Sequence, residues 1–165
     1  MAQVYLSIGS NVQRRHNIKT CLQRLNETYA PLTLSKIYEN PAVGFEGDPF
    51  FNLVVGFNQA VDLESLFRHL REIEEDCGRD RTQAKFSPRT LDIDILLYDD
   101  LITDTPVQLP RDEITRYAFV LKPLAEINPE GIHPQLGETY ANLWQRFAAT
   151  DKAASEPLTE VSLDA

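Results

Sequence analysis

The sequence predicts an α+β domain with an antiparallel sheet, and three observations support this. Four segments alternate apolar and polar residues or are rich in β-branched and aromatic side chains, as strands are. Two segments repeat apolar residues at the 3.6-residue spacing of amphipathic helices, and the chain order is βαββαβ. With 165 residues and 42% hydrophobic side chains, the chain can form one such core.

The first half of the pattern is a strand, a helix and a strand. Residues 3–8 alternate and stop at Gly9-Ser-Asn11, which signals a turn. Residues 17–29 repeat apolar side chains at helical spacing before Pro31. Residues 32–39 have the composition of a second strand.

The second half repeats the pattern and is followed by weaker signals. Residues 50–57 predict the third strand, Asp62 is a suitable N-cap for a helix that ends at Gly78, and residues 91–97 alternate as a fourth strand. Further signals predict a hairpin added to the sheet and two C-terminal helices, over residues 101–103 with 107–109, 118–127 and 140–147.

The boundaries follow from composition. We expect one catalytic domain over residues 1–147. Residues 148–165 are polar and acidic and offer almost nothing to bury, so we expect a disordered tail.

The order βαββαβ is the ferredoxin-like arrangement, in which both helices cross one face of the sheet. A right-handed crossover then places three connections at one rim of the sheet, namely residues 9–11, 40–49 and 79–90. Asp92 begins the fourth strand at the same rim. The last two connections exceed the usual length of about 4–6 residues, and long loops are commonly functional. We therefore expect the functional site at this rim.

The charge excludes several classes of partner. With 25 acidic and 16 basic residues, the net charge of −9 repels nucleic acid and anionic lipid. The chain has no apolar run of about 18 residues and no signal-peptide pattern at its start. The two cysteines and three histidines are scattered and indicate neither a disulfide nor a metal site. We expect a cytoplasmic monomer that acts on small molecules.

A basic run within this acidic chain is the first candidate for chemistry. Four cations stand close together against one acid, Asp80; they are Arg79, Arg81, Lys85 and Arg89. Arginine forks match phosphate oxygens bidentately, so this loop is suited to a polyphosphate. The alternative is a solvated surface loop, as most charge runs are.

Asp92 and Asp94 follow directly. On a strand, residues two apart face the same way, with Cα atoms roughly 6.5–7 Å apart. Carboxylate oxygens without nearby His or Cys favour Mg²⁺, which takes its other ligands from water and substrate phosphates. The alternative is the polar outer face of a half-exposed strand. The adjacent basic run makes that alternative harder to sustain.

The loop over residues 40–49 adds a third feature. Pro41, Val43 and Phe50 supply apolar walls, and Asn52 supplies a carboxamide that donates and accepts. Such a set suits a flat heteroaromatic ligand with amide-like edges. Aromatic residues by themselves are more often part of the core.

Six segments carry a resemblance to a known family. They are Ile8-Gly-Ser-Asn11, Ser35-Lys-Ile-Tyr-Glu-Asn-Pro41, Phe50-Phe-Asn52, Ile73-Glu74 with Gly78-Arg-Asp-Arg81, Pro88-Arg-Thr-Leu-Asp-Ile-Asp-Ile95 and Phe119-Val-Leu-Lys-Pro-Leu124. Over about residues 3–135 the chain resembles the 6-hydroxymethyl-7,8-dihydropterin pyrophosphokinases of folate biosynthesis.

This resemblance implies a Mg²⁺-dependent transfer of the β,γ-diphosphate of ATP to the pterin hydroxymethyl oxygen, releasing AMP. It implies two Mg²⁺ ions at Asp92 and Asp94. Catalytic roles are implied for Arg79, Arg89, Asp92 and Asp94. The positions that match nucleotide-binding residues are Glu74, Arg81, Lys85, Ile95, Arg111 and Arg116. Those that match pterin-binding residues are Asn40, Pro41, Val43, Phe50, Asn52, Phe86 and Phe119.

Some positions depart from the family pattern. Phe86 stands where Trp is common, and Arg111 stands where His is common, which keeps a cation at any pH. Arg116-Tyr-Ala-Phe119 replaces a common Arg-Gly-Phe, so either Arg116 or Tyr117 serves the phosphates. Such substitutions would also suit a second, specialised copy of the enzyme.

Two other function classes remain. A non-catalytic or specialised paralogue would bind pterin or nucleotide without this turnover. A nucleotide-sugar transferase could use Asp-Ile-Asp as its metal site, but 165 residues leave little room for its nucleotide domain.

Overall fold

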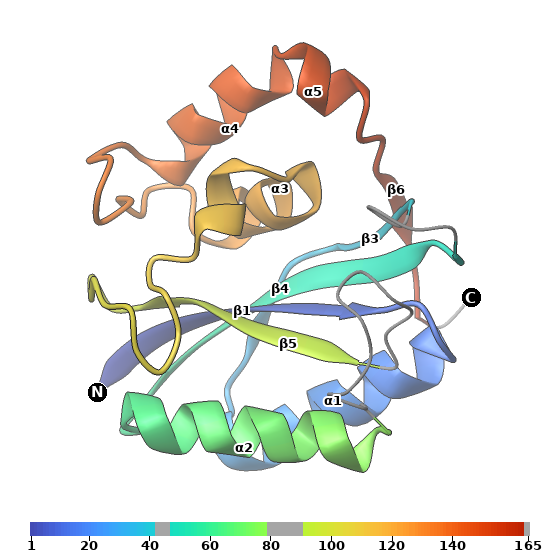
Figure 1. Ribbon diagram of the computed structural model, residues 1–165, viewed down its shortest axis with the longest axis vertical. Coiled ribbons are helices and arrows are strands. Elements are labelled where there is room, and N and C mark those ends of the chain that lie inside the picture. The colour runs from blue at the N-terminus through green and yellow to red at the C-terminus, as the bar shows by residue number, and fades with distance from the viewer. Residues whose placement is uncertain (42–46, 79–90, 164–165) are drawn as a thin grey trace.

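The computed structural model describes residues 1–41, 47–78 and 91–163 of the chain, which are shown in Figure 1. Its elements are β1 (Ala2–Ser10), α1 (Arg14–Tyr29), β2 (Thr33–Leu34), β3 (Ile37–Asn40), β4 (Phe50–Gln59), α2 (Leu63–Asp76), β5 (Asp92–Tyr98), the 3₁₀ helix η1 (Asp112–Thr115), α3 (Ala118–Ile127), α4 (Tyr140–Ala148), α5 (Asp151–Ala154) and β6 (Thr159–Val161).

The strands form an antiparallel sheet in the order β5-β1-β4-β3-β6, and β2 pairs with β4 beside β3. The long central strands β1 and β4 are in register from Ala2↔Gln59 to Ser10↔Phe51. The first four strands of this order are the predicted fourth, first, third and second strands. The ferredoxin-like α+β prediction is therefore confirmed.

Alternating side chains on the strands build one apolar layer on each face of the sheet. Val4, Leu6 and Ile8 of β1 are fully buried in a first layer with residues of α1 and α2. Val54 of β4 and Leu96 of β5 belong to a second layer with residues of α3 and α4. Figure 1 shows the two pairs of helices on opposite sides of the sheet.

Local signals at the helix ends act as expected. Asp62 caps α2, because its Oδ1 accepts a hydrogen bond from the Ser65 backbone N–H at 2.9 Å. Gly78 follows α2 with a φ of 88°, which suits glycine after a helix. Helix α3 has the predicted bounds, whereas α1 begins at Arg14, three residues before the predicted start. Among the described residues, no helix has the length and apolar character needed to cross a membrane.

The predicted second strand is two shorter strands. At Ser35 the backbone N–H donates to the Val54 carbonyl, and the Ser35 hydroxyl accepts from the Val54 N–H, both at 2.9 Å. The next N–H, that of Lys36, donates to Glu126 Oε1 of α3 at 3.3 Å. A side chain thus replaces part of the strand pairing, which separates β2 from β3.

The predicted hairpin after β5 forms, but it does not join the sheet. Thr103 and Leu109 pair through two backbone hydrogen bonds of 3.0 and 2.8 Å. The chain then returns to β5, where the Arg111 N–H donates to the Leu96 carbonyl at 3.0 Å. This contact brings Arg111 beside the outer edge of β5.

The prediction of a disordered tail from residue 148 is wrong for the described part of that segment. After α4, the chain forms α5 and then β6, which pairs antiparallel with β3. Val161 and Leu163 pack against the first apolar layer. The composition of the segment gave no sign of this, because β6 is stabilised by the free edge of β3 rather than by apolar residues of its own.

One rim of the sheet gathers the predicted connections. The register places Asp92, Gly9, Asn52 and Tyr38 side by side in one row across β5, β1, β4 and β3. The turn after β1, the end of β3 and the start of β4 lie at this rim, as the ferredoxin-like arrangement predicts. Much of the two long loops, residues 42–46 and 79–90, lies outside the described residues.

Candidate active site

The paired aspartates of β5 point away from the first apolar layer. Ile93 and Ile95, which alternate with them, are buried in that layer. Asp92 and Asp94 are half-buried on the opposite face of the strand, and the Asp94 side chain is 26% exposed. Glu74 of α2 fixes the strand between them, because its Oε2 accepts a hydrogen bond from the Ile93 N–H at 2.8 Å. The helix and the strand thus hold both aspartates on one face at the rim.

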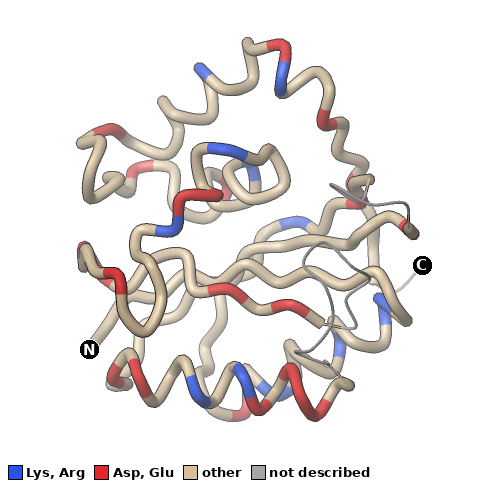
Figure 2. Tube along the Cα trace, viewed as in Figure 1, with Lys and Arg blue, Asp and Glu red and all other residues tan. Residues whose placement is uncertain are grey.

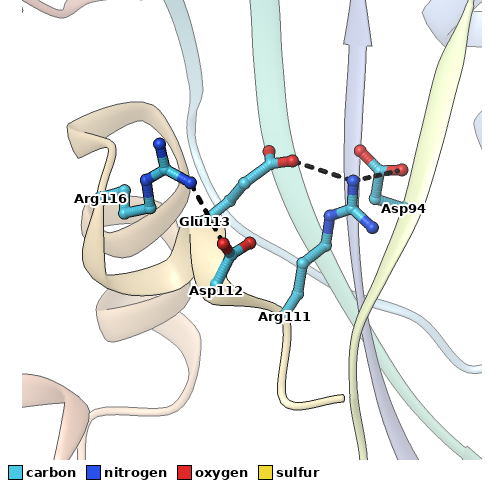
Figure 3. A network of polar contacts seen from close by, with 5 residues as sticks. All are labelled: Asp94, Arg111, Asp112, Glu113 and Arg116. Carbon is cyan, nitrogen blue, oxygen red and sulfur yellow. Dashed lines mark hydrogen bonds and ion pairs between the residues drawn. The ribbon is translucent and has the colours of Figure 1, made fainter. Parts of the chain in front are cut away.

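Arg111 approaches this pair from the segment before η1 (Figure 3). Its Nη2 lies 3.4 Å from Asp94 Oδ1 and 2.9 Å from Glu113 Oε1. Its Nε is buried and has no hydrogen-bond partner in the described part of the chain. Arg116 instead pairs with Asp112 at 3.1 Å, and its side chain is 57% exposed. The structure therefore brings Arg111, but not Arg116, to the aspartates.

The electrostatics of the pair favour a bound cation. Burial raises the pKa of Asp94 well above its usual value, and the negative charge of Asp92 raises it further. Arg111 opposes this shift, and Glu113 and Glu74 add to it. Burial by itself lowers the pKa of Arg111, but Asp94 and Glu113 raise it above the usual arginine value. Positive charge beside Asp94 is thus favourable.

The donor set fits a divalent cation that is shared with a substrate. Over residues 1–41, 47–78 and 91–163, no group of three or more His, Cys, Asp or Glu residues could hold a metal ion. Two carboxylates on one strand face can supply only part of an octahedral shell. Mg²⁺ is commonly bound in this way, with waters and phosphate oxygens as the remaining ligands. Figure 2 shows acidic positions along β5.

A carboxamide pair lies across Gly9 from Asp92. The Asn52 Nδ2 donates to Asn40 Oδ1, and the Asn40 Nδ2 donates to the Pro41 carbonyl at 3.2 Å. Both asparagines are buried. Gly9 makes room for this arrangement, because a Cβ at that position would lie 2.5 Å from Asn52 Oδ1. The rim thus offers amide donors and acceptors a short distance from the acidic pair.

The structure also describes three other predicted pterin-binding residues. Phe50 is half-buried at the start of β4, and Pro41 is exposed after β3. Phe119 lies on α3, where its ring stacks on Tyr117 with centroids 5.1 Å apart. Helix α3 packs against β4, so Phe119 belongs to the same face of the sheet as Asn52.

Six predicted residues lie outside the described part of the chain: Val43, Arg79, Arg81, Lys85, Phe86 and Arg89. The role of the basic run thus stays a prediction. Ile95 is described, and its side chain is buried in the first apolar layer. Only its backbone can therefore face a nucleotide.

Two contributors to the rim were missed by sequence reasoning. Arg14 ties both ends of the 40–49 loop, since it lies 2.8 Å from Glu39 Oε2 and donates to the Pro49 carbonyl at 2.8 Å. Its guanidinium also lies over Phe51, 3.8 Å from the ring centroid. Asn11 donates to the Asp48 carbonyl at 3.1 Å. The sequence signal that could have identified them is the group of polar residues in and just after the turn at residues 9–11.

Fold and site together define a ferredoxin-like domain with an acidic pair and a carboxamide pair on one rim. Residues 5–129 match the family described as 7,8-dihydro-6-hydroxymethylpterin-pyrophosphokinase (HPPK). The 2-amino-4-hydroxy-6-hydroxymethyldihydropteridine pyrophosphokinase of Aquifex aeolicus is 36% identical over 137 residues, covering 81% of this chain and 85% of that protein. A folic acid synthesis protein of Dictyostelium discoideum is 35% identical over 136 residues, which are 81% of this chain and 20% of that protein.

Solved structures agree on the fold. The crystal structure of Plasmodium falciparum HPPK-DHPS wild type with SDX-DHP has a TM-score of 0.72 at 15% identity, covering 94% of this chain. This chain spans 45% of that longer protein. The chain belongs to the HPPK family, whose members are pyrophosphokinases of folate biosynthesis that use ATP.

Proposed function

We propose that this chain transfers the β,γ-diphosphate of ATP to the hydroxymethyl oxygen of 6-hydroxymethyl-7,8-dihydropterin. The observation that supports the proposal most directly is the row across the sheet, in which Asp92 and Asn52 flank Gly9 at one rim. Neighbouring strands are about 4.8 Å apart, so the acidic and carboxamide sites are separated by roughly 10 Å. That spacing suits a triphosphate and a pterin bound end to end.

Asp92 and Asp94 would hold Mg²⁺, with two ions expected along the triphosphate. Bound Mg²⁺ neutralises phosphate charge that develops during transfer. The raised pKa of Asp94 supports this assignment, because it indicates a carboxylate whose charge is only partly compensated by Arg111. Arg111 and Arg116 would contact phosphate oxygens, together with Arg81 and Lys85 of the basic run. Glu74 and Ile95 would complete the nucleotide site.

The pterin would lie against the carboxamide side of the rim. Asn40 and Asn52 would pair with the amide-like edge of the heterocycle, because each carboxamide donates and accepts. Pro41, Val43 and Phe50 would form the walls, with Phe86 and Phe119 as stacking partners. Exclusion of water by these side chains would protect the diphosphate from hydrolysis.

The transfer itself requires positioning more than a strong base. The hydroxymethyl oxygen forms a bond to the β-phosphorus while the bond to the oxygen that bridges the α- and β-phosphates breaks. AMP leaves with that oxygen, and the hydroxyl proton passes to solvent. Arg79 and Arg89 would stabilise the charge on the transferred group, since electrostatic stabilisation and in-line placement supply most of the effect. The proposal includes the expected cytoplasmic monomer, with no nucleic acid or membrane partner.

One assay tests the proposal. The purified chain is incubated with hydroxymethyl-dihydropterin, ATP and Mg²⁺, and the products are separated to distinguish AMP from ADP. The expected result is AMP in equal amount to the pterin diphosphate, lost when a chelator removes the metal. Release of ADP, or pterin binding without any turnover, would contradict it.

A further inference from the structure

The C-terminal segment, residues 149–163, contacts two elements that hold predicted pterin-binding residues. It lies beyond residues 5–129, over which the family match extends. From the end of α4 it passes α3 and continues as β6 along the outer edge of β3, as Figure 1 shows. Helix α3 bears Phe119, and β3 ends at Asn40. The segment therefore connects two sides of the candidate pterin site.

Glu156 caps the first turn of α3. Its Oε1 accepts a hydrogen bond from the Ala118 N–H at 3.1 Å, and its side chain is only 16% exposed. The first N–H groups of a helix have no acceptor within the helix, and Tyr117 at the N-cap position supplies no side-chain acceptor. A carboxylate is also favourable beside the positive end of a helix. Glu156 thus takes the role of an N-cap side chain, because it accepts a hydrogen bond from a backbone N–H in the first turn of α3.

A hollow borders the first turn of α3 on the side of the C-terminal segment. A cavity of about 240 Å³ lies between α3, α4 and the C-terminal segment, and Ala118, Lys122 and Trp144 are among its lining residues. Glu156 also lines this cavity, so its hydrogen bond with the Ala118 N–H joins α3 to the C-terminal segment at the edge of the cavity.

A line of contacts leads from α5 to Phe119. Lys152 lies 3.8 Å from Glu156 Oε2, and its Nζ lies 4.7 Å from the centroid of the Tyr117 ring. The Tyr117 ring in turn stacks on Phe119 at an interplanar angle of 20°. Cation–π contacts and ring-stacking contacts each stabilise a structure by about as much as one hydrogen bond does. The C-terminal segment thus orients the ring that is expected to face the pterin.

The second anchor lies on β3. Tyr38 pairs with Glu160 and Glu39 with Thr159, directly before Asn40. Tyr38 also donates its hydroxyl to Glu126 of α3, which ties the strand to the helix. Movement of α3 relative to β3 would change the space between Phe119 and the carboxamide pair.

We propose that Glu156 is a positioning residue for pterin binding: by capping α3 from the C-terminal segment, it sets the place of Phe119 relative to Asn40 and Asn52. The inference depends on the proposed function for the identity of the ligand. It concerns pterin affinity alone, because the aspartates of β5 are held by other elements.

The test compares Glu156→Ala with Glu156→Gln, which keeps an oxygen acceptor for the Ala118 N–H. Glu156→Ala is expected to raise the pterin KM about three- to tenfold, as loss of one cap predicts, with kcat and the ATP KM unchanged. Glu156→Gln should restore most of the pterin affinity. Glu160→Gln is the matched control, since it removes the same charge from the same segment at a residue that contacts Lys36 rather than α3.

The outcomes separate this inference from the proposed function. A wild-type chain that binds pterin in calorimetry but forms no AMP contradicts the transferase proposal, and the pterin affinities of the variants then decide the inference. Equal pterin affinity in wild type and Glu156→Ala overturns it. So does a parallel loss of kcat and of both substrate affinities, which a general structural defect would give. A wild-type chain that binds no pterin overturns both.

Discussion

Asp94 is held in a position that disfavours its own charge. Burial and the neighbouring Asp92 raise its pKa, and among the residues that the structure describes Arg111 is the cation that lowers it. Two neighbouring, partly buried carboxylates are rarely found in a protein without a cation that compensates their negative charge. The sequence identified both residues from their spacing, but the contact with Arg111 depends on the return of the chain from the 103–109 hairpin to β5.

Replacing Asp94 by Asn should strongly reduce AMP formation without loss of the fold. The expected fall in turnover is on the order of 10²–10³-fold, because a charged group that stabilises the transition state is removed. The thermal midpoint should not fall, since the Asp94 charge is itself unfavourable there. Asp100→Asn, an exposed residue beyond the other end of β5, is the control. Turnover near that of wild type in Asp94→Asn would refute the metal assignment.

Gly9 has a role that the sequence did not reveal. The motif Gly9-Ser-Asn11 indicated a turn, whereas the strand pairing places Gly9 between Asp92 and Asn52. The absence of a side chain at Gly9 leaves the space that the Asn52 carboxamide occupies. Strand register is a tertiary property, so the spacing of motifs along the chain could not supply it.

Gly9→Ala should weaken pterin binding and lower stability. The added Cβ would lie 2.5 Å from Asn52 Oδ1, so the buried carboxamide must move away from Asn40. We expect a free energy of unfolding lower by about 1–3 kcal/mol, as overpacking usually costs, and a higher pterin KM. In the double variant Gly9→Ala, Asn52→Ala, stability should recover in part, because the clash is removed but Asn40 Oδ1 loses its donor, while pterin affinity stays low. Recovery of both would show that Asn52 does not bind pterin.

At the scale of elements, the connection between α3 and α4 is organised by one histidine. His133 Nδ1 accepts hydrogen bonds from the Gln135 and Leu136 N–H groups, both at 3.2 Å. The residue is buried, and burial lowers its pKa. Both facts require the neutral imidazole, because a protonated ring has no acceptor nitrogen.

This histidine should make stability depend on pH. Its pKa is lower in the folded than in the unfolded chain, so the unfolded chain binds more protons as the pH falls. Its contribution to the free energy of unfolding is therefore complete above the unfolded pKa of about 6.5 and is lost as the pH falls toward the folded pKa. Urea unfolding at pH 7.5 and 5.5 should show a smaller difference for His133→Asn than for wild type.

The exposed His16→Asn controls for the loss of one imidazole. If His133→Asn and wild type lose the same stability between the two pH values, burial of His133 does not contribute to acid sensitivity.

For most elements, local signals were sufficient. Asp62 at the start of α2 and Gly78 after it mark a helix through capping and a positive φ, which are properties of a few neighbouring residues. The C-terminal segment shows the opposite case. Strand β6 has little apolar character, and it is a strand because the edge of β3 offers unpaired backbone groups.

At the scale of the whole molecule, two apolar layers share one sheet. Leu6 is fully buried between the sheet and α1 and α2, whereas Trp144 packs against the layer beneath α3 and α4. Because β1 and β4 contribute to both layers, loss of packing on one face should disturb the other. The sequence predicts one domain, and this architecture makes that prediction testable.

Leu6→Ala should lower the free energy of unfolding by about 2–5 kcal/mol, the usual cost of emptying a packed core position. Circular dichroism reports on the whole fold, and the fluorescence of the single tryptophan reports on the second layer. If the chain is one cooperative domain, both signals should shift to the same lower urea midpoint. A shift in circular dichroism without a shift in fluorescence would show two independently folding parts.

The sequence by itself determined the order βαββαβ of the core elements, the ends of α2, the bounds of α3 and the identity of Asp92, Asp94 and Asn52, since periodicity, capping and chemistry are local. Only the tertiary structure decided which of these residues share a row across β5, β1 and β4, that Arg111 rather than Arg116 lies beside Asp94, and that Glu156 reaches α3. These contacts join residues far apart in the chain. Their formation depends on strand register and on the path of loops, which packing of the complete molecule fixes.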